Sequence, residues 1–193
     1  MLRLKVLEAG LIAGAVSFSA GYGYADEFSA RLSGFNEIGS IPSSYTGAVL
    51  SGGTGTVKLD LNGNSITYSQ TYSDVGTTLP NTGTVTQAHI HFGKSRDSGG
   101  VMVFFCGTTA TPGPAGTPTC PMHTGTVTGT WTASSVVGPA AQNIAAGNFA
   151  GLVDALNSNT AYANVHTTFY PAGEIRGQVH RVEKEDQGNQ GNQ

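Results

Sequence analysis

The stretch GTVKLDLNGNSITYSQTY (residues 55–72) decides the fold class, because it alternates apolar and polar residues on both sides of an Asn-Gly pair. Alternation with a period of two is typical of a half-buried strand, and Asn-Gly between two such runs is a strong hairpin signal. The stretch therefore predicts a β-hairpin that turns at Asn62-Gly63. Its expected core-facing residues are Val57, Leu59, Leu61, Ile66, Tyr68 and Tyr72.

Similar short runs occur on both sides of this hairpin. The runs predicted as strands are EFSARLSGF (27–35), TVTQAHIHF (84–92), GVMVFFCG (100–107), GTVTGTWTA (125–133), AYANVHTTF (161–169) and GEIRGQVHR (173–181). One segment differs, because Asn148 can cap a helix in which Phe149, Leu152, Val153 and Leu156 recur at helical spacing. Many short strands with turn signals between them predict an all-β antiparallel sandwich or barrel with one short helix.

Composition agrees with an all-β domain and limits the partners. The chain has 193 residues, of which 28 are Gly and only 11% are charged, and its formal net charge is −3. That length allows one domain with a substantial core, which we place at residues 26–182. The slightly acidic balance gives no electrostatic basis for binding nucleic acid.

The N-terminus has the pattern of an export signal. A basic start, MLRLK, is followed by a short apolar stretch and by the small residues GYGYA, so residues 1–25 are predicted to be a signal peptide cleaved after Ala25. A core helix or a membrane span is the alternative, but the apolar run is short and rich in Gly. The predicted mature chain is secreted or periplasmic and has no membrane span. The polar residues 183–193 are predicted to be a disordered tail.

Export determines how the two cysteines are interpreted. In an oxidising compartment Cys106 and Cys120 are expected to form a disulfide across the loop CGTTATPGPAGTPTC. Closing a loop of about 15 residues stabilises a fold by roughly 3 kcal/mol in the chain-entropy model. A thiolate metal site is the alternative, and it would require reducing conditions.

Three histidines are the strongest candidates for a functional site. Side chains at positions i and i+2 of a strand share one face, so His89 and His91 point the same way, opposite Ala88 and Ile90. His166 likewise lies opposite the apolar face of its strand. We expect these imidazoles on the solvent side of the sheet, where they could bind one metal ion if the strands are neighbours. The alternative is a polar sheet face without metal.

Other residues are assigned supporting roles at this site. Met122 and His123 are possible additional ligands, because the loop that contains them could fold across the same face. Asp97 and Glu174 are candidate acceptors for the second ring nitrogens of the histidines. Arg176 could attract an anion towards the metal, or could pair with Glu174. Imidazole ligands suit copper and zinc, and copper is favoured.

The quoted motifs resemble those of a known family. AHIHFG, GGVMVFFCG, GTVTGTWTASSVVGP and AYANVHTTFYPAGEIRGQVH together resemble the CHRD domain, named from chordin and also found alone in exported bacterial proteins. The resemblance implies an immunoglobulin-like or superoxide-dismutase-like β-sandwich and carries no settled activity. A fainter similarity relates His89, His91 and His166 to the copper ligands of copper/zinc superoxide dismutase, although a zinc half-site is missing.

Three functions follow from these observations. The first is an exported domain that binds copper, or else zinc, through His89, His91 and His166. The second is a metal-free module that binds another extracytoplasmic protein. The third is a copper-only enzyme of the dismutase type. A binding module is favoured over an enzyme, because the chain has neither a phosphate-binding loop nor a nucleophile elbow.

Overall fold

Antiparallel strands are the main secondary structure of the described residues. The computed structural model describes residues 26–38 and 47–183, so the predicted signal peptide and, apart from Glu183, the predicted tail lie outside the described residues. The strands are β1 (Asp26–Ser33), β2 (Thr54–Asn62), β3 (Ser65–Ser73), β4 (Val85–Phe92), β5 (Val101–Cys106), β6 (Gly125–Trp131), β7 (Ala161–Thr167), β8 (Ile175–Gln178) and β9 (His180–Arg181). The helices are α1 (Phe149–Asn157) and the 3-10 turns η1 (Gly34–Asn36), η2 (Ala133–Ser135) and η3 (Ala140–Gln142). The all-β prediction is confirmed.

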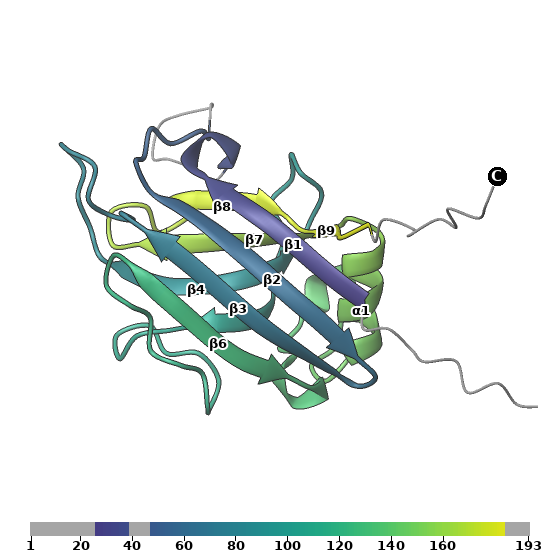
Figure 1. Cartoon of the computed structure of the whole chain (residues 1–193). Coiled ribbons are helices and arrows are strands. Elements are labelled where there is room, and N and C mark those ends of the chain that lie inside the picture. The colour runs from purple at the N-terminus through teal and green to yellow at the C-terminus, as the bar shows by residue number, and fades with distance from the viewer. Residues whose placement is uncertain (1–25, 39–46, 184–193) are drawn as a thin grey trace, which may run out of the picture.

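The strands form one continuous sheet that folds over on itself. Its order is β5-β4-β7-β8-β1-β2-β3-β6, and the half with β1, β2, β3 and β6 packs in front of the half with β4, β7 and β8 (Figure 1). At the two edges of the sheet, β5 and β6, hydrogen bonds from side chains take the place of backbone hydrogen bonds between strands. The Trp131 indole donates a hydrogen bond to the Phe104 carbonyl, and the Tyr68 hydroxyl donates one to the Phe105 carbonyl. The result is a sandwich that is nearly closed into a barrel.

The predicted hairpin forms β2 and β3, and its apolar positions line the core. Leu59 pairs with Tyr68 across the hairpin, and both side chains are buried. Val57, Ile66 and Tyr72 are buried as well, whereas Leu61 near the turn is only partly covered. The other half-sheet contributes residues such as Ile90 and Val165 to the same core. Burial of this apolar surface, at about 25 cal/mol per Å², is the main stabilising contribution.

The predicted helix forms α1, which is the α-helix of the described residues and lies at one end of the sandwich (Figure 1). The Asn148 side chain caps it by accepting a hydrogen bond from the Gly151 N–H, and Leu152 and Leu156 are buried beneath it. No helix among the described residues is long and apolar enough to cross a membrane.

The last predicted strand is divided in two. The segment 173–181 forms β8, which pairs with β7, and β9, which pairs with β1 at the other side of Val179. The division has a local cause, since the Val179 N–H bonds the Ala161 carbonyl while its side chain is fully buried. Because β8 also pairs with β1 at Ser33 and Arg176, the segment lies between the two half-sheets and joins them.

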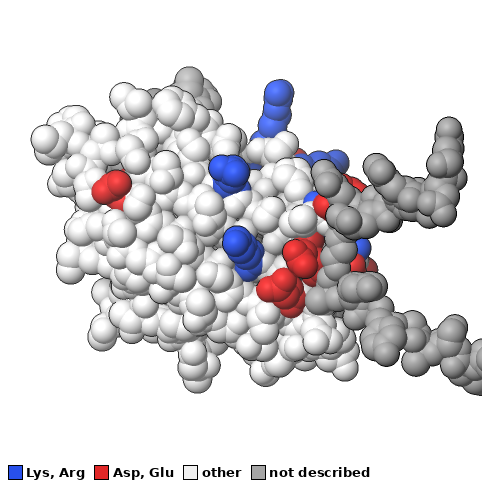
Figure 2. Space-filling model, in the orientation of Figure 1, with Lys and Arg blue, Asp and Glu red and all other residues white. Residues whose placement is uncertain are grey.

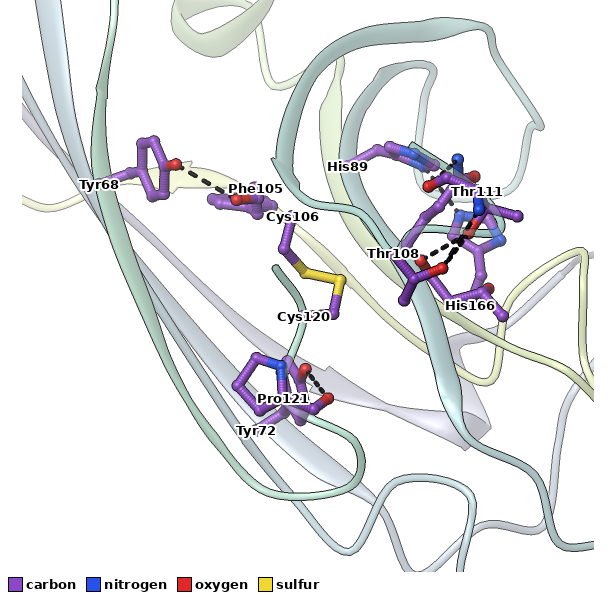
Figure 3. Close-up of a disulfide and its surroundings, with 12 residues drawn as sticks. Tyr68, Tyr72, His89, Phe105, Cys106, Thr108, Thr111, Cys120, Pro121 and His166 are labelled. Carbon is purple, nitrogen blue, oxygen red and sulfur yellow. Dashed lines mark hydrogen bonds between the residues drawn. A yellow bond between two sulfur atoms is a disulfide. The ribbon is translucent and has the colours of Figure 1, made fainter. Parts of the chain in front are cut away.

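The predicted disulfide is present and ties the loop between β5 and β6 to the core. Cys106 and Cys120 are joined, and both are buried (Figure 3). On the facing half-sheet, the hydroxyls of Tyr68 and Tyr72 donate to the carbonyls of Phe105 and Pro121, the neighbours of the two cysteines. Both ends of the cystine loop (residues 106–120) are thus fixed to β3.

Candidate metal centre

The three predicted histidines lie on one face of two neighbouring strands. In the β4–β7 pair, Gln87 is opposite His166, His89 is opposite Asn164, and His91 is opposite Tyr162. Strand alternation therefore places all six side chains on one face. The other face carries Ala88, Ile90, Ala163 and Val165, all fully buried in the core. The prediction that the histidines share the face away from the core is confirmed.

The ring nitrogens lie close enough to belong to one site. One potential ligand atom from each of His89, His91 and His166 lies within 4.8 Å of the other two, and among the described residues no other such cluster of His, Cys, Asp or Glu occurs. The shortest link joins Nδ1 of His89 to Nε2 of His166, at 3.1 Å. Two nitrogens bound to one ion are at most about 4.2 Å apart, twice the metal–nitrogen bond length. The rings therefore need only a small movement to enclose an ion.

The prediction that these rings face solvent is wrong. His89 is 3% exposed, His91 is 8% exposed and His166 is 9% exposed. Two loops, around Gly99 and around Pro171, cover this face of the sheet. The Gly99 carbonyl accepts a hydrogen bond from His91, and the Pro171 carbonyl accepts one from His166. The Phe104 ring meets the His89 ring edge to face, with centroids 4.3 Å apart. The expected exposure fails because the loops between the strands fold back over the sheet.

The cystine loop also contacts this face. The Gln87 amide donates to the Thr111 carbonyl, and the Thr111 hydroxyl donates to the Thr86 carbonyl. Figure 3 shows Thr108 and Thr111 of this loop near His89 and His166. The loop therefore packs beside the histidines, as the sequence suggested, although through threonines.

Backbone carbonyls set the proton positions on the rings. Nδ1 of His91 lies 3.0 Å from the Gly99 carbonyl, and Nδ1 of His166 lies 3.0 Å from the Pro171 carbonyl. Since a carbonyl only accepts, both Nδ1 atoms carry the proton and both Nε2 atoms present a lone pair. His89 then donates from Nδ1 to Nε2 of His166. Nε2 of His89 and Nε2 of His91 are buried without a hydrogen-bond partner.

Burial keeps all three imidazoles uncharged. Desolvation, together with smaller effects of His166 and His91, lowers the pKa of His89 to about 2. Desolvation also lowers the pKa of His91 to about 4 and that of His166 to about 4. At neutral pH the site is therefore a set of neutral nitrogen donors, which is the form that binds metal ions.

A stacked aromatic ring supports one side of the cluster. The Tyr162 ring is parallel to the His91 ring, with centroids 4.8 Å apart and 3° between their planes. The Arg176 guanidinium from β8 lies 3.4 Å from the centroid of the same Tyr162 ring. Sequence reasoning missed Tyr162, although it lies four residues before His166 and alternation places it on the same face. The carbonyls of Gly99 and Pro171 were also missed, and no residue type signals such a role.

The two acidic residues assigned to supporting roles do not contact the imidazoles through their carboxylates. The Glu174 carboxylate accepts hydrogen bonds from Ser51, Gly76 and Thr167, and the Asp97 carbonyl accepts one from Arg176. Carbonyls occupy the positions at the imidazoles that Asp97 and Glu174 were expected to fill.

The two possible additional ligands are not part of the histidine cluster. The Met122 side chain is 62% exposed, whereas the three rings are buried. Nδ1 of His123 lies 2.9 Å from the Val75 carbonyl, and His123 does not belong to the group of mutually close ligands. The structure therefore brings His89, His91 and His166 together, and neither Met122 nor His123 joins them.

Comparison with known proteins agrees with the sequence motifs. The family model of the CHRD domain matches residues 28–179. No curated protein and no solved structure matches the chain.

Proposed function

The chain belongs to the CHRD domain family, and on that premise we propose that it is an extracytoplasmic module that binds one transition-metal ion, copper in preference to zinc, through His89, His91 and His166. In this proposal His91 and His166 bind through Nε2, because Gly99 and Pro171 hold the opposite ring nitrogens. The task of such a module is metal storage or delivery.

The observation that carries the proposal is the pair of buried ring nitrogens without a partner. Nε2 of His89 and Nε2 of His91 make no hydrogen bond among the described residues. A buried polar atom without a partner typically costs about 1–3 kcal/mol. Two such atoms beside a third imidazole are unfavourable in a metal-free core and become favourable once a cation accepts their lone pairs.

The donor set supports copper over zinc. All three donors are imidazole nitrogens, which suit both metals, and divalent copper binds such sites more tightly than zinc in the general affinity order of divalent ions. No carboxylate or thiolate of the described residues joins the cluster. The metal preference of the site would therefore be that of imidazole nitrogens, which favours copper over zinc.

The disulfide and the family support an extracytoplasmic location. A disulfide such as Cys106–Cys120 persists in oxidising compartments and is rare in the cytosol. Secretion or transfer to the periplasm would follow from the signal peptide predicted at residues 1–25.

Titration of the metal-free protein with copper and zinc tests the proposal. We expect one copper ion per chain, tighter binding of copper than of zinc, and loss of binding in His91→Ala and His166→Ala. His180→Ala is the matched control, because His180 is exposed and lies outside the cluster. Absence of binding at micromolar copper in a folded protein, or equal loss in His180→Ala, would contradict the proposal.

A second candidate function is a metal-free module that binds another extracytoplasmic protein. It is favoured by large apolar side chains that are exposed, namely Leu50, Leu79, Met122 and Phe169. Their segments are linked by hydrogen bonds from Gly52 to Thr78, from Thr84 to Thr168 and from Val85 to Met122. Failure of the copper titration would favour this candidate.

A further inference from the structure

A cleft of about 750 Å³ lies between β1, η1, the end of β8 and the loop after β4. This volume lies within the range of small-molecule sites, about 300–1,000 Å³. The residues that line the cleft are Ser29, Ala30, Arg31, Phe35, Asn36, Ile38, Ser95, Arg96, Arg176, Gln178 and His180. None of the histidines in the candidate metal centre belongs to this lining, so the cleft is a separate feature.

Among the described residues, the lining of the cleft is basic and contains no carboxylate. Arg31, Arg96 and Arg176 all belong to it, although the whole chain has only nine Lys and Arg residues and a net charge of −3. Charged side chains are sparse on the face formed by β1, β2, β3 and β6 (Figure 2). Arg31 and Arg96 are exposed, and the salt bridge found among the described residues joins Arg181 to Asp26 instead. The cleft thus concentrates positive charge.

Arg176 holds a fixed position in the wall of the cleft. It is 2% exposed, donates to the carbonyls of Lys94 and Asp97, and lies over the Tyr162 ring. The buried Glu37 carboxylate is close enough to act on its charge. A guanidinium fixed in this way is preorganised, while the two exposed arginines are free to adjust to a ligand.

The remaining groups define the size and chemistry of the ligand. Ser29, Ser95 and Asn36 offer hydroxyl and amide donors, and Phe35, which is 69% exposed, offers an apolar surface at the cleft. The Gln178 amide is held by the carbonyls of Gly93 and Asn159. Several donors around arginines are the arrangement that recognises carboxylate or phosphate oxygens.

We propose that this cleft binds a small organic anion with more than one carboxylate or phosphate group, held by Arg31 and Arg96 with Arg176 behind them. The proposal does not depend on metal binding. Because Arg176 lies over Tyr162, and Tyr162 lies on His91, the anion site is also next to the candidate metal centre through direct contacts.

Calorimetric titration of the metal-free protein with citrate and with pyrophosphate tests the cleft. The chelator used to remove metal must be dialysed away first, because it is itself a polyanion. The salt concentration is kept at about 0.15 M, where charges more than about 8 Å apart are screened. We expect saturable binding of one anion per chain, and the tighter of the two probes identifies carboxylate or phosphate as the preferred group.

Substitution of the exposed arginines localises the binding. Arg31→Gln combined with Arg96→Gln is expected to weaken anion binding at least about tenfold, since each removes a charge-assisted hydrogen bond. Arg181→Gln is the matched control, because it removes the same charge from a guanidinium already paired with Asp26 and Asn157. The proposal is overturned if neither probe binds at millimolar concentration, if the double variant binds like the wild type, or if Arg181→Gln loses as much affinity.

Discussion

Nδ1 of His89 lies 3.1 Å from Nε2 of His166, so the two imidazoles already form a hydrogen bond across neighbouring strands. The same bond occupies the lone pair with which His166 would bind a metal. In the proposed complex, His89 must therefore turn so that its free Nε2 faces the ion, while the bonds to Gly99 and Pro171 keep the other two rings in place. The three rings already lie together, so we expect the cluster to close on a bound ion by a local change at His89.

Acid is expected to destabilise the metal-free protein. The pKa values of His91 and His166 are lowered by burial from 6.5 to about 4, so the unfolded chain binds more protons than the folded one between these pH values. The free energy of unfolding should therefore fall as the pH drops from 6.5 towards 4, by about 1.4 kcal/mol per pKa unit for each ring. Urea unfolding at a series of pH values measures this change in the free energy of unfolding.

The variant His166→Gln should show a shallower dependence on pH, because one titrating ring has been removed. His180→Gln, which changes an exposed ring, should retain the wild-type slope. A free energy of unfolding that stays constant over this interval would contradict the burial of neutral imidazoles.

Tyr162 is expected to support metal binding through Gly99. Its hydroxyl accepts a hydrogen bond from the Gly99 N–H, and the Gly99 carbonyl in turn accepts from His91. Tyr162→Phe keeps the stacked ring but removes the hydroxyl, so copper affinity should fall by about tenfold, as for other groups that orient metal ligands. Copper titration measures the effect, and Tyr72→Phe is the control, because it removes a hydroxyl that bonds the Pro121 carbonyl instead. Unchanged affinity in Tyr162→Phe would show that the loop holds His91 without the hydroxyl.

Removal of the disulfide should lower stability substantially. Cys106 and Cys120 are 14 residues apart, and opening a loop of this size costs about 3 kcal/mol. The double variant Cys106→Ala, Cys120→Ala should lose this amount in urea unfolding, and reduction of the wild-type protein should reproduce the loss. If neither treatment lowers the free energy of unfolding, the hydroxyls of Tyr68 and Tyr72 suffice to hold the loop ends.

The sequence predicted the features that depend on local pattern. Alternation identified the hairpin of β2 and β3 and placed His89, His91 and His166 on one face, because the period of a strand is independent of its surroundings. Asn148 was identified as a helix cap for the same reason, since capping involves only the next few residues.

The features that depend on distant segments could not be predicted. The histidines are buried because the loops around Gly99 and Pro171 cover the sheet, and the groups that orient the rings are backbone carbonyls, which every residue has. Glu174, expected at the imidazoles, instead accepts from Ser51, far away in the sequence. The division at Val179 likewise depends on distant strands, since β8 pairs with β7 and β1 while β9 pairs with β1.

Nitrogen-15 NMR of the histidine rings tests the central claim most directly, because diamagnetic zinc can be added to the labelled metal-free protein. Without metal, His91 and His166 should show the tautomer with the proton on Nδ1. One equivalent of zinc should shift the ring nitrogens of His89, His91 and His166 together and leave those of His123 and His180 unchanged. Unmoved signals from the three clustered rings, or shifts confined to His123 or His180, would contradict the claim that these three imidazoles bind one metal ion.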